Sequence, residues 1–74
     1  MGSVIGSLRP TRDAIARHSA ERDSLLPREV HVHPDGKAVA VYERSGAVAR
    51  IHYATIYDVL DKHGLGTADL EEVP

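Results

Sequence analysis

The sequence predicts a small two-layer α+β domain in the order helix, three-stranded antiparallel meander, helix (α-β-β-β-α). Three short segments rich in Val and Ala, at residues 29–33, 38–43 and 47–53, are separated by the turn-forming sequences Pro-Asp-Gly and Ser-Gly. A segment with helical features lies on each side of them. At 74 residues, the chain has the length of one domain and is close to the lower size limit for a fold held by its core alone.

The composition limits both the core and the function. The sequence has no Cys, Trp or Phe and only three Tyr, which excludes disulfides and thiolate metal sites and leaves a core of Val, Leu, Ile and Ala. A core of this size has little room for a buried ligand pocket, so we expect function on the surface. Asn and Gln are absent and Arg outnumbers Lys, which indicates a GC-rich coding origin.

Charge and hydropathy narrow the classes of partner. No apolar run approaches the roughly 18 residues that span a bilayer, and the N-terminus lacks a signal-peptide pattern, so we expect a cytoplasmic protein without a membrane partner. The net charge of −2 hides a basic first part, residues 1–50, and an acidic remainder, residues 51–74. This balance differs from the strongly basic one typical of nonspecific nucleic-acid binding.

The first helix is expected to begin at Thr11, whose hydroxyl group can accept a hydrogen bond from an unpaired backbone amide. It should run to about residue 24, because Pro27 prevents much further extension. Its apolar face is sparse, so either His18 and the Arg side chains complete a buried stripe or the helix rests partly on a partner. The preceding residues 1–9 are predicted to be a flexible lead.

The first hairpin can close in two ways. A two-residue turn at Asp35 and Gly36 would place the valines of both strands on one face, whereas a type I turn at Pro34 with a glycine bulge would place them on opposite faces. The apolar pattern favours the two-residue turn, in which Pro34 cannot donate a ladder hydrogen bond.

The second hairpin is expected to have a three-residue loop with Gly46 in the left-handed conformation. Together the two expected registers define an apolar and a polar face. The apolar face comprises Val30, Val32, Val39, Val41, Ala49 and Ile51. The polar face comprises His31, His33, Ala38, Ala40, Tyr42, Val48, Arg50 and His52.

The second helix is predicted from Thr55 as N-cap to Gly64 as C-cap, with Leu65 supplying the apolar contact expected just beyond a glycine cap. Residues 68–74 are predicted to be an acidic tail, which leaves residues 10–67 as the folded domain.

Three histidines of the expected polar face suggest a metal site as one interpretation. His33 and His52 would lie on either side of a small Ala in one row, about 9.6 Å apart at the backbone, with His31 two residues along. Three His and a water form a known catalytic zinc arrangement. Alternation alone also places polar residues on a solvent-exposed face, and we favour that interpretation. We therefore predict no cofactor, and the alternative is zinc held by His31, His33 and His52.

The sequences HPDGKAVAV at residues 33–41 and ATIYDVLDKHGL at residues 54–65 resemble the HicA family of small toxins. The resemblance covers about residues 28–65. It implies a fold like that of the double-stranded-RNA-binding domain, and it implies cleavage of messenger RNA by a histidine on a strand. Residues 26–28 do not match the family's Gly-Ser-His run. For such a ribonuclease, the acid or base would be His31 or His33, and the phosphate-binding residues would be Arg9, Arg12, Arg17 and Arg28.

The favoured function is that of a non-enzymatic interaction or regulatory module that binds a macromolecular partner. We predict that this partner is a protein, and a homodimer is a further option. The thin core, the sparse first helix and the expected exposure of the polar sheet face motivate this prediction. The alternatives are nucleic-acid binding or a HicA-like RNA-cleaving toxin, and a His-rich metal-binding domain. The predicted partner-binding residues are Tyr42, Val48, Arg50, Arg12 and Arg17.

Overall fold

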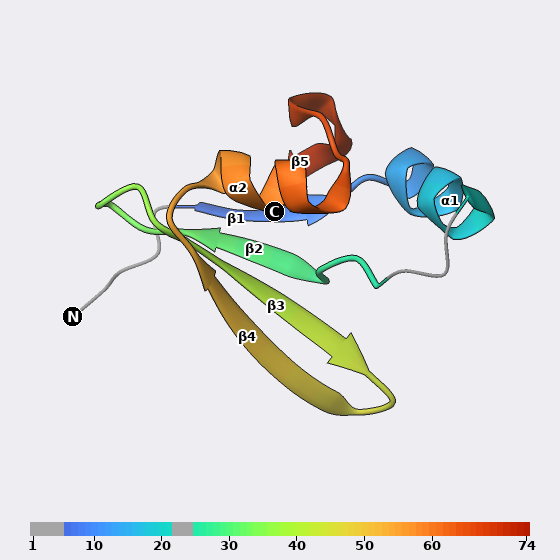
Figure 1. Ribbon diagram of the computed structural model, residues 1–74, viewed down its shortest axis with the longest axis horizontal. Coiled ribbons are helices and arrows are strands. Elements are labelled where there is room, and N and C mark those ends of the chain that lie inside the picture. The colour runs from blue at the N-terminus through green and yellow to red at the C-terminus, as the bar shows by residue number, and fades with distance from the viewer. Residues whose placement is uncertain (1–5, 22–24) are drawn as a thin grey trace.

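The computed structural model describes residues 6–21 and 25–74. This part of the chain forms one five-stranded antiparallel sheet with strand order β4-β3-β2-β1-β5 and two α-helices (Figure 1). The predicted three-stranded meander flanked by helices is therefore wrong, although β2, β3 and β4 do form a meander within the larger sheet. In chain order the elements are β1 (Gly6–Pro10), α1 (Arg12–Glu21), β2 (Glu29–Val32), β3 (Ala38–Arg44), β4 (Ala47–Tyr53), α2 (Ile56–His63), the 3-10 helix η1 (Thr67–Asp69) and β5 (Leu70–Glu72).

The two additional strands come from segments that we expected to lie outside the domain. Leu8 of β1 pairs with Val30 of β2 on one side and with Glu72 of β5 on the other. Residues 6–9 of the expected lead and residues 70–72 of the expected tail are thus part of the sheet. Both strands are short and contain Gly, Ser or Glu, which have low strand propensity. Their stability therefore comes from pairing with a neighbouring strand. Residues 1–5 lie outside the described residues.

The first helix begins as predicted but does not cover the sheet. Thr11 Oγ1 accepts a hydrogen bond from the Ala14 amide at 3.1 Å, which confirms the N-cap. Ala14 is fully buried, whereas Ile15 is 47% exposed. The helix lies beyond the end of β1 and β2 (Figure 1). Because α1 lies at this end, α2 is the helix that packs on the sheet.

The second helix is confirmed together with both of its caps. Thr55 Oγ1 accepts a hydrogen bond from the Asp58 amide at 3.3 Å. Gly64 has the left-handed conformation, with φ 65°, and the Leu65 amide donates to the Leu60 carbonyl oxygen at 2.8 Å. These are the contacts of a glycine C-cap. The chain changes direction at this cap and continues to η1 and β5.

The first hairpin has the bulged turn that we weighed and did not favour. The Gly36 amide donates to the His33 carbonyl oxygen, and the His33 amide donates to the Lys37 carbonyl oxygen, both at 2.9 Å. Pro34 therefore occupies the second position of a type I turn, which suits its fixed φ and requires no donor. Val30 pairs with Ala40, so the valines of β2 and those of β3 lie on opposite faces.

The second hairpin also differs from the predicted register by one residue. Arg44 pairs with Ala47, which leaves a two-residue turn of Ser45 and Gly46 with φ 53° and 84°. Two positive φ values are typical of a type I′ turn, whose twist matches that of the flanking strands. The expected three-residue loop is therefore wrong.

These two register differences change the composition of both faces. We call the side that packs against α2 the covered face and the opposite side the open face. The core consists of Val30, Ala38, Ala40 and Val59, with Tyr42, Tyr53 and Ile56 packed against it. The small alanines allow α2 to approach the sheet closely. The covered face of β2, β3 and β4 comprises Val30, Val32, Ala38, Ala40, Tyr42, Ala49, Ile51 and Tyr53; the open face includes Glu29, His31, Val39, Val41, Val48, Arg50 and His52.

Candidate functional site

The structure places two of the three predicted histidines in one row of the open face. His31 and His52 both lie opposite Val39, on its two sides, whereas His33 lies in the turn after β2. Nε2 of His31 is 2.9 Å from Oε1 of Glu29. Within residues 6–21 and 25–74, no group of three or more His, Asp or Glu side chains is arranged to hold a metal ion.

The predicted partner-binding residue Tyr42 lies on the covered face rather than on the open one. Its hydroxyl oxygen is 3.0 Å from that of Tyr53 and 2.7 Å from Nε2 of His63, while Nδ1 of His63 is 2.7 Å from the Val59 carbonyl oxygen. A carbonyl oxygen only accepts, so Nδ1 carries the proton and donates. When the second ring nitrogen, Nε2, carries no proton, it accepts from the Tyr42 hydroxyl group, which in turn accepts from Tyr53.

This hydrogen-bonded chain gives Tyr42 a structural role. Burial of the hydroxyl group, and secondarily its hydrogen bond with Tyr53, raise the pKa of Tyr42 well above its ordinary value. The neutral phenol is thus the form that the fold holds. Because Tyr42 packs between the sheet and the end of α2, its assignment to the open face is corrected.

The arginines that we predicted to bind phosphate do not form one basic surface. Arg9 pairs with Glu71 at 3.0 Å and Arg28 pairs with Glu43 at 3.1 Å. These ion pairs are exposed and neutralise part of the positive charge locally.

The two predicted residues of α1 differ in their contacts. Arg17 pairs with Asp69 at 2.8 Å, and Oδ2 of Asp69 also accepts the Gly66 amide at 2.8 Å. These hydrogen bonds, that of Gly66 first and that of Arg17 second, lower the pKa of Asp69. Arg12 is exposed on α1, away from Val48 and Arg50 of β4.

Val48 and Arg50 lie two residues apart on one face of the sheet. Both are on the open face of β4, which is an edge strand of the sheet. Six of its seven residues are exposed, and only Tyr53 is half-buried. Val48 is 49% exposed on the open face, and Ile51 is 47% exposed on the covered face.

The register identifies the backbone groups that β4 presents to solvent. Arg44 and Ala47 flank the two-residue turn and form a hydrogen-bonded pair. Because such pairs alternate along an antiparallel ladder, the odd-numbered residues of β4 bond to β3. The amide and carbonyl groups of Val48, Arg50 and His52 therefore point outward from the sheet.

The opposite edge of the sheet is much shorter. β5 has three residues. Hydrogen bonds to β1 alternate along this edge: the Thr11 amide donates to the Asp69 carbonyl oxygen, and the Val73 amide donates to the Ser7 carbonyl oxygen, both at 2.9 Å. Pro74 then follows without an amide proton. The two edges are thus unequal: β5 has the short, acidic form typical of a protected edge, and β4 does not.

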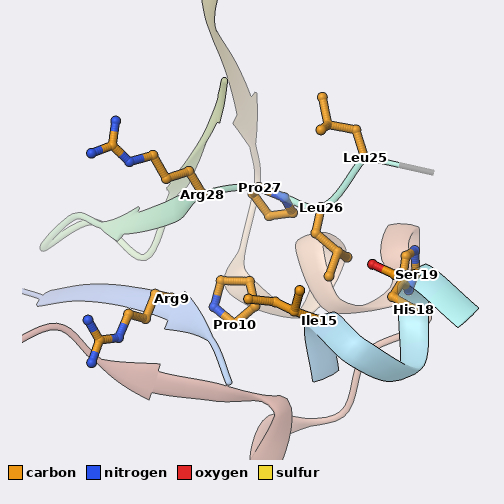
Figure 2. Close-up of a pocket in the computed structure, with 9 residues that line it drawn as sticks. All are labelled: Arg9, Pro10, Ile15, His18, Ser19, Leu25, Leu26, Pro27 and Arg28. Atoms are coloured by element: carbon orange, nitrogen blue, oxygen red, sulfur yellow. The ribbon is translucent and has the colours of Figure 1, made fainter. Parts of the chain in front are cut away.

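A groove of about 370 Å³ lies between α1 and the segment before β2 (Figure 2). Its apolar walls include Ile15 and Leu26, whose side chains point toward each other, while the arginine head groups extend away from them. Residues 22–24 join its two walls and lie outside the described residues, so we assign the groove no ligand. It is lined by Arg9, Pro10, Ile15, His18, Ser19, Leu25, Leu26, Pro27 and Arg28.

Comparison with known proteins gives no family for this chain. No family model matches, and neither a curated protein nor a solved structure shows significant similarity. The resemblance to the HicA family therefore stays a prediction. In the part of the chain that the structure describes, no helix has the length and apolar character needed to cross a membrane.

Proposed function

We propose that this protein is a non-enzymatic interaction module that binds an extended segment of a partner protein by β-strand addition to β4. The observation that carries the proposal is the exposed, seven-residue edge strand whose outward amides and carbonyls have no partner strand among residues 6–21 and 25–74. In β-strand addition, backbone hydrogen bonds supply affinity, and alternate side chains supply specificity.

The contrast between the two edges supports this function. Proteins commonly protect an edge strand by making it short, by placing Pro or charged residues on it, or by covering it. β5 is three residues long and has two Glu, whereas β4 has seven residues, no Pro and a single Arg, Arg50. The β3–β4 hairpin also extends away from the rest of the sheet (Figure 1), so the part of β4 next to the turn lies away from both helices.

Selection of peptides tests the proposal without knowledge of the natural partner. Random 12-residue peptides displayed on phage would be selected on the wild-type protein, and the best binders would be added to 15N-labelled protein. We expect the amide protons of Val48, Arg50 and His52 to exchange more slowly with solvent when the peptide is bound, because each outward amide then has an acceptor.

Two variants of one residue separate the backbone from the side chain. Val48→Pro removes an outward amide proton without removing a bond to β3, and we expect it to weaken peptide binding about tenfold. Val48→Ala retains the amide and should change the affinity by less than about threefold. Three outcomes would contradict strand addition. The selected peptides could bind Val48→Pro as tightly as the wild type, they could protect only amides outside β4, or the selection could yield no binder.

A second candidate function is supported by the pair of Glu29 and His31 on the open face. A carboxylate 2.9 Å from an imidazole nitrogen orients the ring for general acid–base chemistry, which is the chemistry that RNA cleavage requires. Wild-type protein would then cleave a single-stranded RNA oligonucleotide, and His31→Ala would abolish cleavage. RNA that stays intact with the wild-type protein would eliminate this candidate.

A further inference from the structure

The charge of the β4 edge distinguishes it from the rest of the sheet. Arg50 lies in the middle of β4, on the open face, with His52 two residues further along. Within the described residues the Arg50 guanidinium group makes no ion pair, whereas Arg9 and Arg28 each have a Glu partner. No Asp or Glu lies on β4. Glu29 and Glu43 lie on the same face but pair with His31 and Arg28. An added strand therefore meets, at its centre, a positive charge that makes no ion pair.

The register determines which side chains of an added strand would meet this charge. Residues directly opposite each other in an antiparallel pair point to the same face and lie within about 5.5 Å. Partner residues opposite Arg50 and His52 therefore point to the open face. The residue between them lies opposite Ile51 and points to the covered face, where Ile51 is 47% exposed.

A second copy of β4 is a poor occupant of this edge. The antiparallel register that pairs all seven residues of β4 with a second β4 places Arg50 directly opposite Arg50 of the other copy. Like charges in that position destabilise strand pairing. The edge therefore favours a strand of opposite charge over a copy of itself.

We propose that the partner segment is an extended, acidic strand in which Asp or Glu alternates with apolar residues, and that Arg50 selects it. This inference rests on the proposed function and adds the chemistry of the partner. The acidic side chains pair with Arg50 and lie beside His52 on the open face, and the intervening apolar side chain contacts Ile51 on the covered face. Ala49 leaves space for a bulky apolar residue opposite it.

Two short peptides that differ only in charge test the inference. The probes are Ser-Val-Glu-Val-Glu-Val-Ser and Ser-Val-Lys-Val-Lys-Val-Ser, both with acetylated and amidated ends, titrated into 15N-labelled protein at pH 7 and low salt. We expect the Glu peptide to bind about tenfold more tightly, since Arg50 attracts the Glu peptide and repels the Lys peptide, and each of these exposed charge interactions contributes up to about 1 kcal/mol. High salt should reduce this difference.

Matched variants assign the charge preference to one residue. Arg50→Glu should reverse the order of the two peptides, whereas Lys62→Glu, which makes the same change in net charge on α2, should leave the order unchanged. Equal binding of both peptides, or the same preference in Arg50→Glu, would overturn the inference.

The same experiment separates this inference from the proposed function. If both peptides bind equally and both are lost in Val48→Pro, strand addition stands and the acidic partner is wrong. If neither probe binds but library-selected peptides protect the outward amides of β4, the acidic partner is again wrong and strand addition stands. If no peptide of any kind protects those amides, both proposals fail. A concentration-dependent dimer with protected Val48, Arg50 and His52 amides would identify a second copy as the occupant.

Discussion

The Tyr42 hydroxyl group lies 2.7 Å from Nε2 of His63 and thereby joins β3 to the last residue of α2. This contact fixes the end of the helix that covers the small core of Val30 and Val59. The chain that continues from it, to Tyr53 on one side and to the Val59 carbonyl oxygen on the other, is the main side-chain network between the helix and the sheet in the described residues.

Tyr42→Phe is therefore expected to lower the free energy of unfolding by about 1 to 2 kcal/mol at pH 7, because two hydrogen bonds are lost while the ring remains. Urea unfolding followed by circular dichroism measures this change. Tyr57→Phe is the matched control, since Tyr57 is 68% exposed and should leave the unfolding midpoint unchanged. Equal midpoints for both variants would contradict the role given to the network.

The pH dependence of stability at alkaline pH should also depend on Tyr42. Its folded-state pKa is raised, so above the ordinary tyrosine pKa of about 10 the folded protein binds more protons than the unfolded chain. Stability from this group is present below that pH and is lost as the pH rises. Tyr42→Phe should accordingly lose less stability than the wild type between pH 9 and pH 11. Parallel losses in the two proteins would show that another group controls the alkaline transition.

Acidic pH should weaken the connection between α1 and η1. The pKa of Asp69 is lowered by the Gly66 amide and by Arg17, so the folded state binds fewer protons than the unfolded state as Asp69 titrates. The stability that it contributes is present above the ordinary aspartate pKa and is lost as the pH falls. The difference in Tm between pH 7 and pH 3 should be smaller in Asp69→Asn than in the wild type. Asp61→Asn, an exposed residue of α2, is the control and should retain the wild-type difference.

The C-cap of α2 depends on backbone conformation rather than on space. Gly64 has φ 65°, and a Cβ atom placed there would have no neighbouring atom within 4 Å. Gly64→Ala should thus cost about 1 kcal/mol through the left-handed conformation alone, and Gly64→Asn should cost less, because Asn adopts this conformation more readily. Thermal unfolding of the two variants checks the order, and an alanine variant as stable as the wild type would contradict this account.

Removal of residues 70–74 should destabilise the protein by about 2 kcal/mol, because it removes the β1–β5 hydrogen bonds and the partly buried Leu70. It should also expose β1 as a new edge, so the truncated protein should self-associate. Urea unfolding and size-exclusion chromatography measure the two effects. Removal of Pro74 alone is the control. A monomeric truncated protein with wild-type stability would show that β5 is dispensable.

The sequence predicted most accurately those elements whose signals are local. The caps at Thr55 and Gly64 define α2 through contacts within four residues, and the turns defined β2, β3 and β4 to within one residue at each end. The strands β1 and β5 were missed because each depends on a partner that is distant in the sequence.

The registers were wrong for a different reason. Residues 38–41 read Ala-Val-Ala-Val, so β3 is apolar on both faces and alternation does not indicate which face is covered. The choice is made by packing, since the alanines admit α2, and by turn geometry, since Ser45 adopts a positive φ that its residue type does not predict. Tyr42 was consequently placed on the wrong face.

The candidate site was predicted only in part. Val48 and Arg50 were chosen for exposure, and they do lie exposed on the open face of β4; their role in partner binding stays a prediction. The predicted meander already places residues 47–53 at an edge of the sheet, but the outward-facing backbone groups could not be derived, because they depend on the two-residue turn that sets the register of β4. The importance of its backbone groups follows from topology rather than from residue type.

The pairing of β1 with β5 joins residues that are far apart in the chain, since Arg9 and Glu71 are separated by 62 positions. The β2–β3 and β3–β4 hairpins involve near neighbours and can form within microseconds. During synthesis, β1 emerges from the ribosome early but acquires its outer neighbour only after residues 70–73 have followed. A chain in which β5 has not yet paired with β1 therefore presents two open edges, β1 and β4, instead of one.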